Sequence, residues 1–322
     1  MAKDATRYPA PLRAAQAGER ESREAARQTG RIVARFGQHS IIAADDGQEY
    51  EAVRRGKRLD AVVGDRVSYT LHHGSAAIEA IEPRRNLLYR EDAERTKPLA
   101  ANVDQVAIVF APQPAPQREF LWRAMLACAA ADVDALLVLN KIDIESPAAR
   151  AAFDEACALG ARGLCVSAKT RPAEAREALD RECRGRVTLF VGHSGVGKSS
   201  LLSLLLGERL RVGELSQRSG QGKQTTTATR WYPYEDEGAL IDSPGFQSFG
   251  LHHLNAADLP GWMPDFAAAP GACRFADCRH LEEPDCRIRA ALAAGTIAPE
   301  RHAFYRRLLD EGESSRLRSP RR

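Results

Sequence analysis

The sequence predicts an α/β protein with a small β-barrel before its main sheet and a short helical unit after it. Three observations support this organisation of the 322 residues. Short β-like segments fill residues 30–95, apolar strands and helical segments alternate from 96 to 250, and three cysteines with a histidine gather after residue 251. Alternating strands and helices are typical of a parallel sheet that is covered on both faces.

Composition excludes several classes of protein. Apolar residues make up 44% of the chain, but no run approaches the ~20 residues that span a bilayer. The first residues lack the hydrophobic stretch of a secretory signal, and the odd number of cysteines, seven, argues against a disulfide framework. We therefore expect a cytoplasmic protein that does not contact membranes. We also expect it to be a monomer.

The charge distribution indicates a polyanionic partner. Net charge is only +3, yet residues 1–30 carry six Lys/Arg against four Asp/Glu, and residues 271–322 carry eleven against eight. Residues 1–29 contain scarcely any large apolar side chain, so we expect a flexible basic arm. A solvated tail is the preferred interpretation of this arm, and contact with RNA is the alternative.

Residues 30–95 show the pattern of a small all-β domain. Five short strands separated by turn residues suit a closed barrel of the OB type, a common oligonucleotide binder. The loop 54–58 carries four positive charges. It either contacts an RNA phosphate backbone or simply keeps the barrel in solution. The predicted strands cover residues 31–36, 40–43, 50–53, 62–69 and 77–81.

After a polar link at 91–97, the chain alternates between strands and helices. Cysteines that fall within these segments are expected to be small buried hydrophobic residues. The predicted strands cover 103–110, 135–139, 163–166, 187–191 and 239–241. The predicted helices cover 120–128, 148–159, 173–182 and a segment that begins near Lys198.

A phosphate-binding loop follows the apolar strand 187–191 and precedes a helix. Its G-x-x-x-x-G-K-S pattern lets backbone N–H groups turn toward one anion, and the helix dipole adds positive potential. Lys198 is expected to reach the β- and γ-phosphates, and Ser199 to bind Mg²⁺. The predicted nucleotide-binding residues are Gly192, His193, Ser194, Gly195, Val196, Gly197, Lys198, Ser199 and Ser200.

Two further loops indicate that the base is guanine. Residues 140–143 form an Asn-Lys-x-Asp motif after a strand, where open α/β sheets bind ligands. Asp143 can accept hydrogen bonds from N1–H and the exocyclic amine of guanine, a donor pair that adenine lacks. A second base-contacting loop follows the next strand. The residues of these loops are Asn140, Lys141, Ile142, Asp143, Ser167, Ala168 and Lys169.

Two segments beyond the phosphate loop have the features of nucleotide switches. The Gly- and Thr-rich residues 218–229 suit a loop that places a threonine on Mg²⁺, with Thr226 favoured over its neighbours Thr225 and Thr227. Asp242 would hold the metal through water, and the Gly245 N–H could sense the γ-phosphate. Phe246 stands where many GTPases carry a water-orienting glutamine, which predicts slow hydrolysis without a partner. Candidates for that role are Gln247, His252 and His253.

The order of these motifs is reversed relative to ordinary small GTPases, in which the phosphate loop comes first. The chain resembles the circularly permuted GTPases, and specifically the RsgA (YjeQ) family of small ribosomal subunit biogenesis GTPases. The resemblance implies hydrolysis of GTP to GDP and phosphate, stimulated by the small ribosomal subunit, and a role in late maturation of that subunit through its rRNA. Gln224 replaces a histidine that is frequent in the family, and Gly195 replaces an asparagine by which some related GTPases bind potassium.

A cysteine-histidine cluster near the C-terminus has the spacing C-x₄-C-x-H-x₅-C. Three thiolates and one imidazole make a closed tetrahedral set for one structural Zn²⁺, with no open position for substrate. The resemblance includes such a site, and metal-free reduced thiols are the alternative. The predicted ligands are Cys273, Cys278, His280 and Cys286.

These patterns predict four segments of chain. They are a flexible basic arm at 1–29, an OB-fold RNA-binding domain at 30–95, a circularly permuted GTPase domain at 96–250, and a zinc-binding helical domain with a basic tail at 251–322. A P-loop ATPase or kinase, and an RNA-binding scaffold whose nucleotide only regulates docking, are the alternatives.

Overall fold

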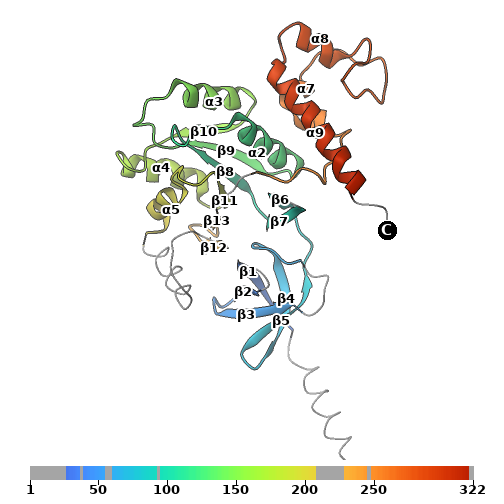
Figure 1. The fold of residues 1–322 in the computed structure, drawn as a ribbon. Helices are drawn as coiled ribbons and strands as arrows, with labels where there is room; N and C mark the ends of the chain where they lie inside the picture. Colours follow the sequence, from blue (N-terminus) through green and yellow to red (C-terminus); the bar gives the residue numbers. More distant parts are fainter. Residues whose placement is uncertain are drawn as a thin grey trace, which may run out of the picture.

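Three packed parts follow one another along the chain in the computed structural model (Figure 1). The structure describes residues 27–36, 39–54, 60–92, 95–207, 228–244 and 248–318. Most of the predicted arm, most of the basic loop 54–58 and the glycine-threonine loop therefore lie outside the described residues.

The N-terminal part is a closed five-stranded barrel. Strands β1–β2–β3 and β4–β5 pair antiparallel, β3 pairs parallel with β5, and β1 pairs with β4 to close the sheet. Ile32, Ile42, Val67 and Ile78 fill its interior without exposure to solvent. The strands are β1 (Gln28–Phe36), β2 (His39–Ala44), β3 (Glu49–Arg54), β4 (Arg66–His72) and β5 (Ser75–Ile81).

The prediction of a strand at 62–69 is wrong at its beginning, because residues 62–65 form a turn. Gly64 has φ 94°. The fully buried Asp65 accepts a hydrogen bond from the Val62 N–H at 2.8 Å and pairs with Arg84 at 2.7 Å. A buried carboxylate is stable only when it is paired in this way, and these local bonds override the β-propensity of the valines.

Two elements connect the barrel to the main sheet, and the sequence pattern did not predict either. The expected polar link is instead part of a hairpin, β6 (Leu87–Asp92) and β7 (Arg95–Ala101), because Leu88 and Leu99 are buried. Strand β12 (Thr229–Pro233) pairs with barrel strand β1 on one side and with β13 on the other. The barrel and the main sheet therefore share one continuous set of hydrogen-bonded strands.

The main sheet is parallel except for β12, with strand order β10-β9-β8-β11-β13-β12. One hydrophobic cluster packs α2 and α3 on one face, and a second packs α4 and α5 on the other, so the predicted doubly covered sheet is confirmed. The strands are β8 (Gln105–Phe110), β9 (Asp134–Leu139), β10 (Arg162–Cys165), β11 (Val187–Val191) and β13 (Ala239–Asp242). The helices are α2 (Arg118–Ala130), α3 (Pro147–Ala158), α4 (Pro172–Cys183) and α5 (Lys198–Leu206).

The C-terminal part is helical and packs beside α2 (Figure 1). Phe266, Ile288 and Phe304 are fully buried in it. Its elements are η1 (Leu259–Trp262), α7 (Pro264–Ala267), α8 (Arg287–Ala293) and α9 (Pro299–Arg318). The last helix is the longest of these elements, with 20 residues. Within the ranges that the structure describes, no helix has the length and apolarity needed to cross a membrane.

Candidate functional site

The predicted nucleotide-binding loops meet at the carboxyl edge of the parallel sheet. Strands β9, β11 and β13 all end there, and each is followed at once by a predicted motif. The residues of these strands nearest the edge are buried on both faces, which holds the loops on a rigid support. Open α/β sheets bind ligands at this edge.

The phosphate loop depends on glycines at positions where a side chain does not fit. Gly192 has φ 152°, and a Cβ atom on it would lie 2.2 Å from the Val109 carbonyl oxygen. Gly197 has φ 98° and immediately precedes helix α5. A Cβ on Gly197 would lie 2.3 Å from Asn140 Nδ2. These glycines therefore allow the backbone both to turn and to pack tightly against the neighbouring loop.

Lys198 is held inside the loop. Its side chain is buried, and Nζ donates to the Gly192 carbonyl oxygen at 2.9 Å. Burial lowers the pKa of Lys198, and the nearby charge of Asp242, itself only 5% exposed, partly opposes this effect. The loop therefore keeps its one lysine over the glycines, with a buried carboxylate close by. Ser199 and Ser200 are exposed at the start of the helix.

His193 is the only aromatic residue of the phosphate loop. Its ring lies 4.4 Å from the Phe120 ring at the start of α2. Burial, and then the charge of Lys198, lower the pKa of His193. Ser194 and Gly195 are exposed and Val196 is buried.

Asn140 joins the base loops to the phosphate loop. Its Nδ2 donates to the Val196 carbonyl oxygen at 2.9 Å, across 56 residues of sequence. Its Oδ1 accepts from the Ala168 N–H at 3.2 Å. Lys141 adds a further connection, because its Nζ donates to the Gly195 carbonyl oxygen at 2.7 Å. Three predicted motifs thus form one hydrogen-bonded unit.

Asp143 stands exposed at the rim of this unit. Ser167 donates its hydroxyl to the Asp143 carboxylate. This hydrogen bond, with smaller effects of Lys169 and Lys141, lowers the pKa of Asp143. The carboxylate is therefore ionised and oriented before any ligand arrives, while Ile142 beside it is 37% exposed.

The expected switch residues are only partly described. Asp242 ends β13, and the next residue, Ser243, donates to the Phe190 carbonyl oxygen at 2.7 Å. Of the candidates for positioning water, His252 faces Glu91 at 3.4 Å and His253 lies 4.2 Å from Tyr89, so both contact β6. The other residues named in the two predicted switch segments lie outside the described residues. They are Gln224, Thr225, Thr226, Thr227, Gly245, Phe246 and Gln247.

Two contacts of the site were not predicted. Lys141 Nζ also donates to the Gln113 carbonyl oxygen at 2.8 Å, so the loop after β8 supports the base motif. Residues 248–250 pair with β6, since the Glu91 N–H donates to Ser248 at 3.0 Å and the Gly250 N–H to Tyr89 at 3.1 Å. The sequence features that could have indicated these two contacts are the prolines after β8 and the apolar residues of β6.

The four cysteine-histidine residues converge as predicted. Their ligand atoms all lie within 4.8 Å of one another. His280 Nδ1 lies 3.5 Å from Cys273 Sγ and 3.3 Å from Cys286 Sγ, and these two sulfurs are 3.9 Å apart. Sulfurs that share a tetrahedral ion with Zn–S bonds near 2.3 Å are about 3.8 Å apart. The donor set, completed by Cys278, fits a metal ion.

The sheet topology and the reversed order of the loops define a circularly permuted P-loop GTPase. The family model described as RsgA GTPase matches residues 81–252. The chain belongs to the RsgA GTPase family and is therefore a GTP hydrolase.

Curated relatives are similar over nearly the whole chain. The small ribosomal subunit biogenesis GTPase RsgA of Burkholderia pseudomallei (strain K96243) is 43% identical over 316 residues, which cover 97% of this chain and 98% of that protein. The protein of the same name from Neisseria meningitidis serogroup C (strain FAM18) is 42% identical over 294 residues, covering 90% and 94%.

Solved structures share the fold. YjeQ from Thermotoga maritima matches with a TM-score of 0.64 and 26% identity, over 89% of this chain and 99% of that one. The circularly permuted GTPase YloQ matches with a TM-score of 0.63 and 22% identity, over 92% and 98%, and this likeness concerns the fold alone.

Proposed function

We propose that this chain hydrolyses GTP at the carboxyl edge of its sheet and that it does so on the small ribosomal subunit, assisting late maturation of that subunit. The observation that carries the proposal is the double hydrogen bond of Asn140 to Val196 and Ala168, which unites base and phosphate loops despite their reversed order. The partner is inferred from the printed name of relatives that are 43% and 42% identical.

The base is held on one side of the unit and the phosphates on the other. Asp143 accepts the two guanine N–H groups, and the residues 167–169 line the base. The N–H groups of 192–197 and Lys198 surround the phosphates. The proposed nucleotide-binding residues are Asn140, Lys141, Ile142, Asp143, Ser167, Ala168, Lys169, Gly192, His193, Ser194, Gly195, Val196, Gly197, Lys198, Ser199 and Ser200.

Turnover is assigned to a small group of residues around the γ-phosphate. Mg²⁺, when bound with GTP, neutralises the charge that develops on the phosphate oxygens. Ser199, Thr226 and Asp242 offer the hydroxyl and carboxylate oxygens that Mg²⁺ prefers, Gly245 offers its N–H, and Lys198 supplies positive charge. Because Phe246 carries no polar group, we infer that a partner completes the positioning of water.

The metal of the C-terminal cluster is proposed to be one structural Zn²⁺. Thiolate and imidazole ligands favour zinc over magnesium or calcium, and four protein ligands leave no position for substrate. Cys273, Cys278, Cys286 and Nδ1 of His280 would hold the ion.

The remaining parts are proposed to contact rRNA. The arm at 1–29, the barrel domain at 30–95 and the basic tail of the 251–322 domain would meet the subunit around the GTPase domain at 96–250, with the protein acting as a cytoplasmic monomer. Lys and Arg outnumber Asp and Glu at both ends of the chain, and the barrel loop 54–58 adds four positive charges.

Base recognition is tested by Asp143→Asn. We expect preference to shift from GTP to xanthosine triphosphate, because an amide can donate to the xanthine oxygen where a carboxylate cannot. Affinities for both nucleotides are measured by calorimetry, with Glu145→Gln in the same loop as a matched control. Unchanged use of GTP by Asp143→Asn would contradict the assignment and favour an ATPase or kinase.

The partner is tested by phosphate release with and without purified small ribosomal subunits. We expect slow release by the protein alone and a clear stimulation by small subunits but not by large ones. Equal rates in all three conditions would refute action on the small subunit and favour a scaffold whose nucleotide regulates docking.

A further inference from the structure

A single buried arginine connects the GTPase part to the last helix. Arg123 of α2 is 7% exposed. Its Nε donates to Glu119 on the same helix at 3.1 Å, and its Nη2 donates to Glu311 of α9. Its Nη1 lies 3.9 Å from the Glu91 carboxylate of β6. One guanidinium therefore serves carboxylates from three different elements.

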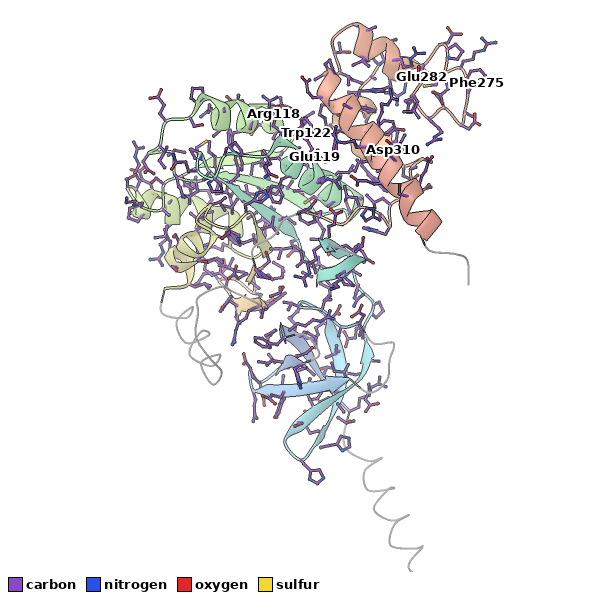
Figure 2. All side chains as sticks on the ribbon, in the orientation of Figure 1. Arg118, Glu119, Trp122, Phe275, Glu282 and Asp310 are labelled. Atoms are coloured by element: carbon purple, nitrogen blue, oxygen red, sulfur yellow. The ribbon has the colours of Figure 1, made fainter. Side chains whose placement is uncertain are left out.

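The rest of the interface between α2 and α9 follows one stripe of the last helix. The Phe304 ring lies 5.5 Å from the Trp122 ring, and Arg307 pairs with Glu119 at 2.8 Å. Phe304, Arg307 and Glu311 are three and four residues apart, the spacing of one helical face. Figure 2 shows Glu119 and Trp122 on the side of α2 nearest α9. Glu311 is the end of this stripe.

Several buried polar atoms at or near this interface, including one carboxylate oxygen of Glu311, have no hydrogen-bond partner among the described residues. Within the described part of the chain, five buried side-chain polar atoms have no hydrogen-bond partner, and three of them are Arg123 Nη1, Glu311 Oε2 and His252 Nδ1. A cavity of about 260 Å³ lies beside them, lined in part by Leu251, Leu308 and Glu311. Unpaired buried groups and adjacent space favour a second arrangement with different partners.

The contacts around Arg123 extend to residues 248–252. This segment follows Asp242, a residue proposed to hold Mg²⁺. Residues 248–250 pair with β6 through backbone hydrogen bonds of 3.0 and 3.1 Å. The Glu91 carboxylate on β6 faces His252 Nε2 at 3.4 Å and Arg123 on its other side. A shift of residues 248–252 would therefore move the Glu91 carboxylate, which competes with Glu311 for Arg123.

We propose that Arg123 is a positioning residue that couples the placement of α9, and with it the metal-bearing unit, to the nucleotide state by exchanging Glu311 for Glu91. The inference rests on the nucleotide site proposed above. In one arrangement Arg123 holds Glu311 and α9 is docked. In the other, residues 248–252 bring Glu91 within hydrogen-bond distance of Nη1, and α9 is released into the neighbouring space.

The charge needed for this exchange is retained in spite of burial. Burial by itself lowers the pKa of Arg123, but hydrogen bonds and charge from Glu311 and then Glu119 outweigh it, so the pKa is raised. The guanidinium therefore stays protonated in both arrangements and can pair with whichever carboxylate lies within reach.

The test compares Glu311→Gln with Asp310→Asn. Both variants remove one negative charge from α9, but Asp310 is exposed and lies on the side of α9 away from α2 (Figure 2). The ratio of affinities for GDP and a non-hydrolysable GTP analogue is measured by calorimetry, and exchange of backbone amides in 299–318 and 248–254 by mass spectrometry. By reciprocity, loss of the coupling changes the affinity ratio, by about fivefold or more.

We expect Glu311→Gln to change the ratio and to speed exchange in both segments, with Asp310→Asn like wild type. Arg123→Lys keeps the charge but places all its donors on one nitrogen, which cannot span the positions of Glu311 and Glu91, so it should act in the same direction. A wild-type affinity ratio in Glu311→Gln would overturn the proposal even if α9 exchanged faster, because the contact would then be only structural. Absence of nucleotide binding by the wild-type protein would instead refute the nucleotide site itself.

Discussion

The nucleotide edge and the cysteine-histidine cluster both gather polar residues, but they are held together in different ways. At the nucleotide edge, Asn140 is only 2% exposed and its amide is satisfied by two backbone groups of the protein. In the cluster, Cys273 and Cys278 are half-exposed, and the flanking helices η1, α7 and α8 have only four to seven residues. The first site is supported by a sheet, whereas the second is flanked by these short helices and would depend on the proposed metal ion.

This difference predicts opposite responses to loss of the ligand. Hydrogen bonds among protein groups persist when a nucleotide leaves, so the edge is preformed. Cysteine and histidine side chains around an empty centre have no such compensation, because the bonds that would hold them together are bonds to the ion. The following predictions test this contrast, from the largest effect to the smallest.

Loss of a metal ligand should unfold the C-terminal part and leave the sheet intact. Cys278→Ser, or treatment with a strong chelator, removes an ion whose binding stabilises small zinc domains by about 10–16 kcal/mol. Amide exchange should become fast in 259–298 while β8 and β11 keep their protection. Cys157→Ser, at a half-buried cysteine in α3, is the control. Unchanged exchange would show that the cluster does not stabilise the fold.

Gly197→Ala should abolish tight nucleotide binding. The new Cβ would lie 2.3 Å from Asn140 Nδ2, on a residue with φ 98°. We expect affinity for GDP to fall by about a hundredfold or more, since strain and a steric clash combine. Gly207→Ala at the other end of the same helix is a matched control, because Gly207 also has positive φ, 56°, but nothing within 4 Å of the added atom. Equal losses in both variants would contradict the role of close packing.

Asn140→Ala should weaken nucleotide binding by roughly 30-fold, or about 2 kcal/mol, because the Val196 carbonyl and the Ala168 N–H lose their shared partner. Asn86→Ala is the control, since Asn86 likewise bridges both backbone groups of one residue, Val103, away from the site. Both variants should be less stable in thermal unfolding, but only Asn140→Ala should lose affinity. An affinity like that of wild type would show that the two loops are positioned independently.

The smallest of the predicted effects concerns His193→Gln, which should change how the free energy of unfolding depends on pH. Burial lowers the pKa of His193 in the folded protein below its ordinary 6.5, so the unfolded chain takes up a proton first as pH falls. Stability that is present above that ordinary value is therefore lost as pH falls through the lowered pKa. Because the ring is partly exposed, we expect a fraction of a kcal/mol. Urea unfolding at pH 7.5 and 5.5 should show a smaller loss in His193→Gln, and equal losses would contradict this.

Short-range patterns were sufficient for the sheet and its loops. The predicted strand 187–191 agrees with β11, and the predicted order of strands and helices through the nucleotide domain agrees with the structure apart from β7 and β12. Such strands are buried on both faces, so their sequences are apolar runs that end abruptly at the functional loops. The convergence of the three cysteines and the histidine was also predictable, because they lie within one short segment.

Other features had no local signature. Strand β12 pairs with barrel strand β1 on one edge and with β13 of the GTPase sheet on the other. Its five residues contain no pattern from which these two partners could be predicted. Residues 91–97 of the hairpin β6–β7 were predicted as a polar link because five of these seven residues are charged. Arg123 is paired with a carboxylate 188 residues away in sequence.

The sequence by itself determined the parallel α/β sheet, the loops at its carboxyl edge, the cysteine-histidine cluster and the reversed order of motifs, because each depends on residues that are neighbours in the chain. Only the tertiary structure decided that Asn140 connects the two loops, that the barrel continues into the main sheet, and that Arg123 joins three elements. These contacts depend on side-chain geometry between distant segments, which no local pattern encodes.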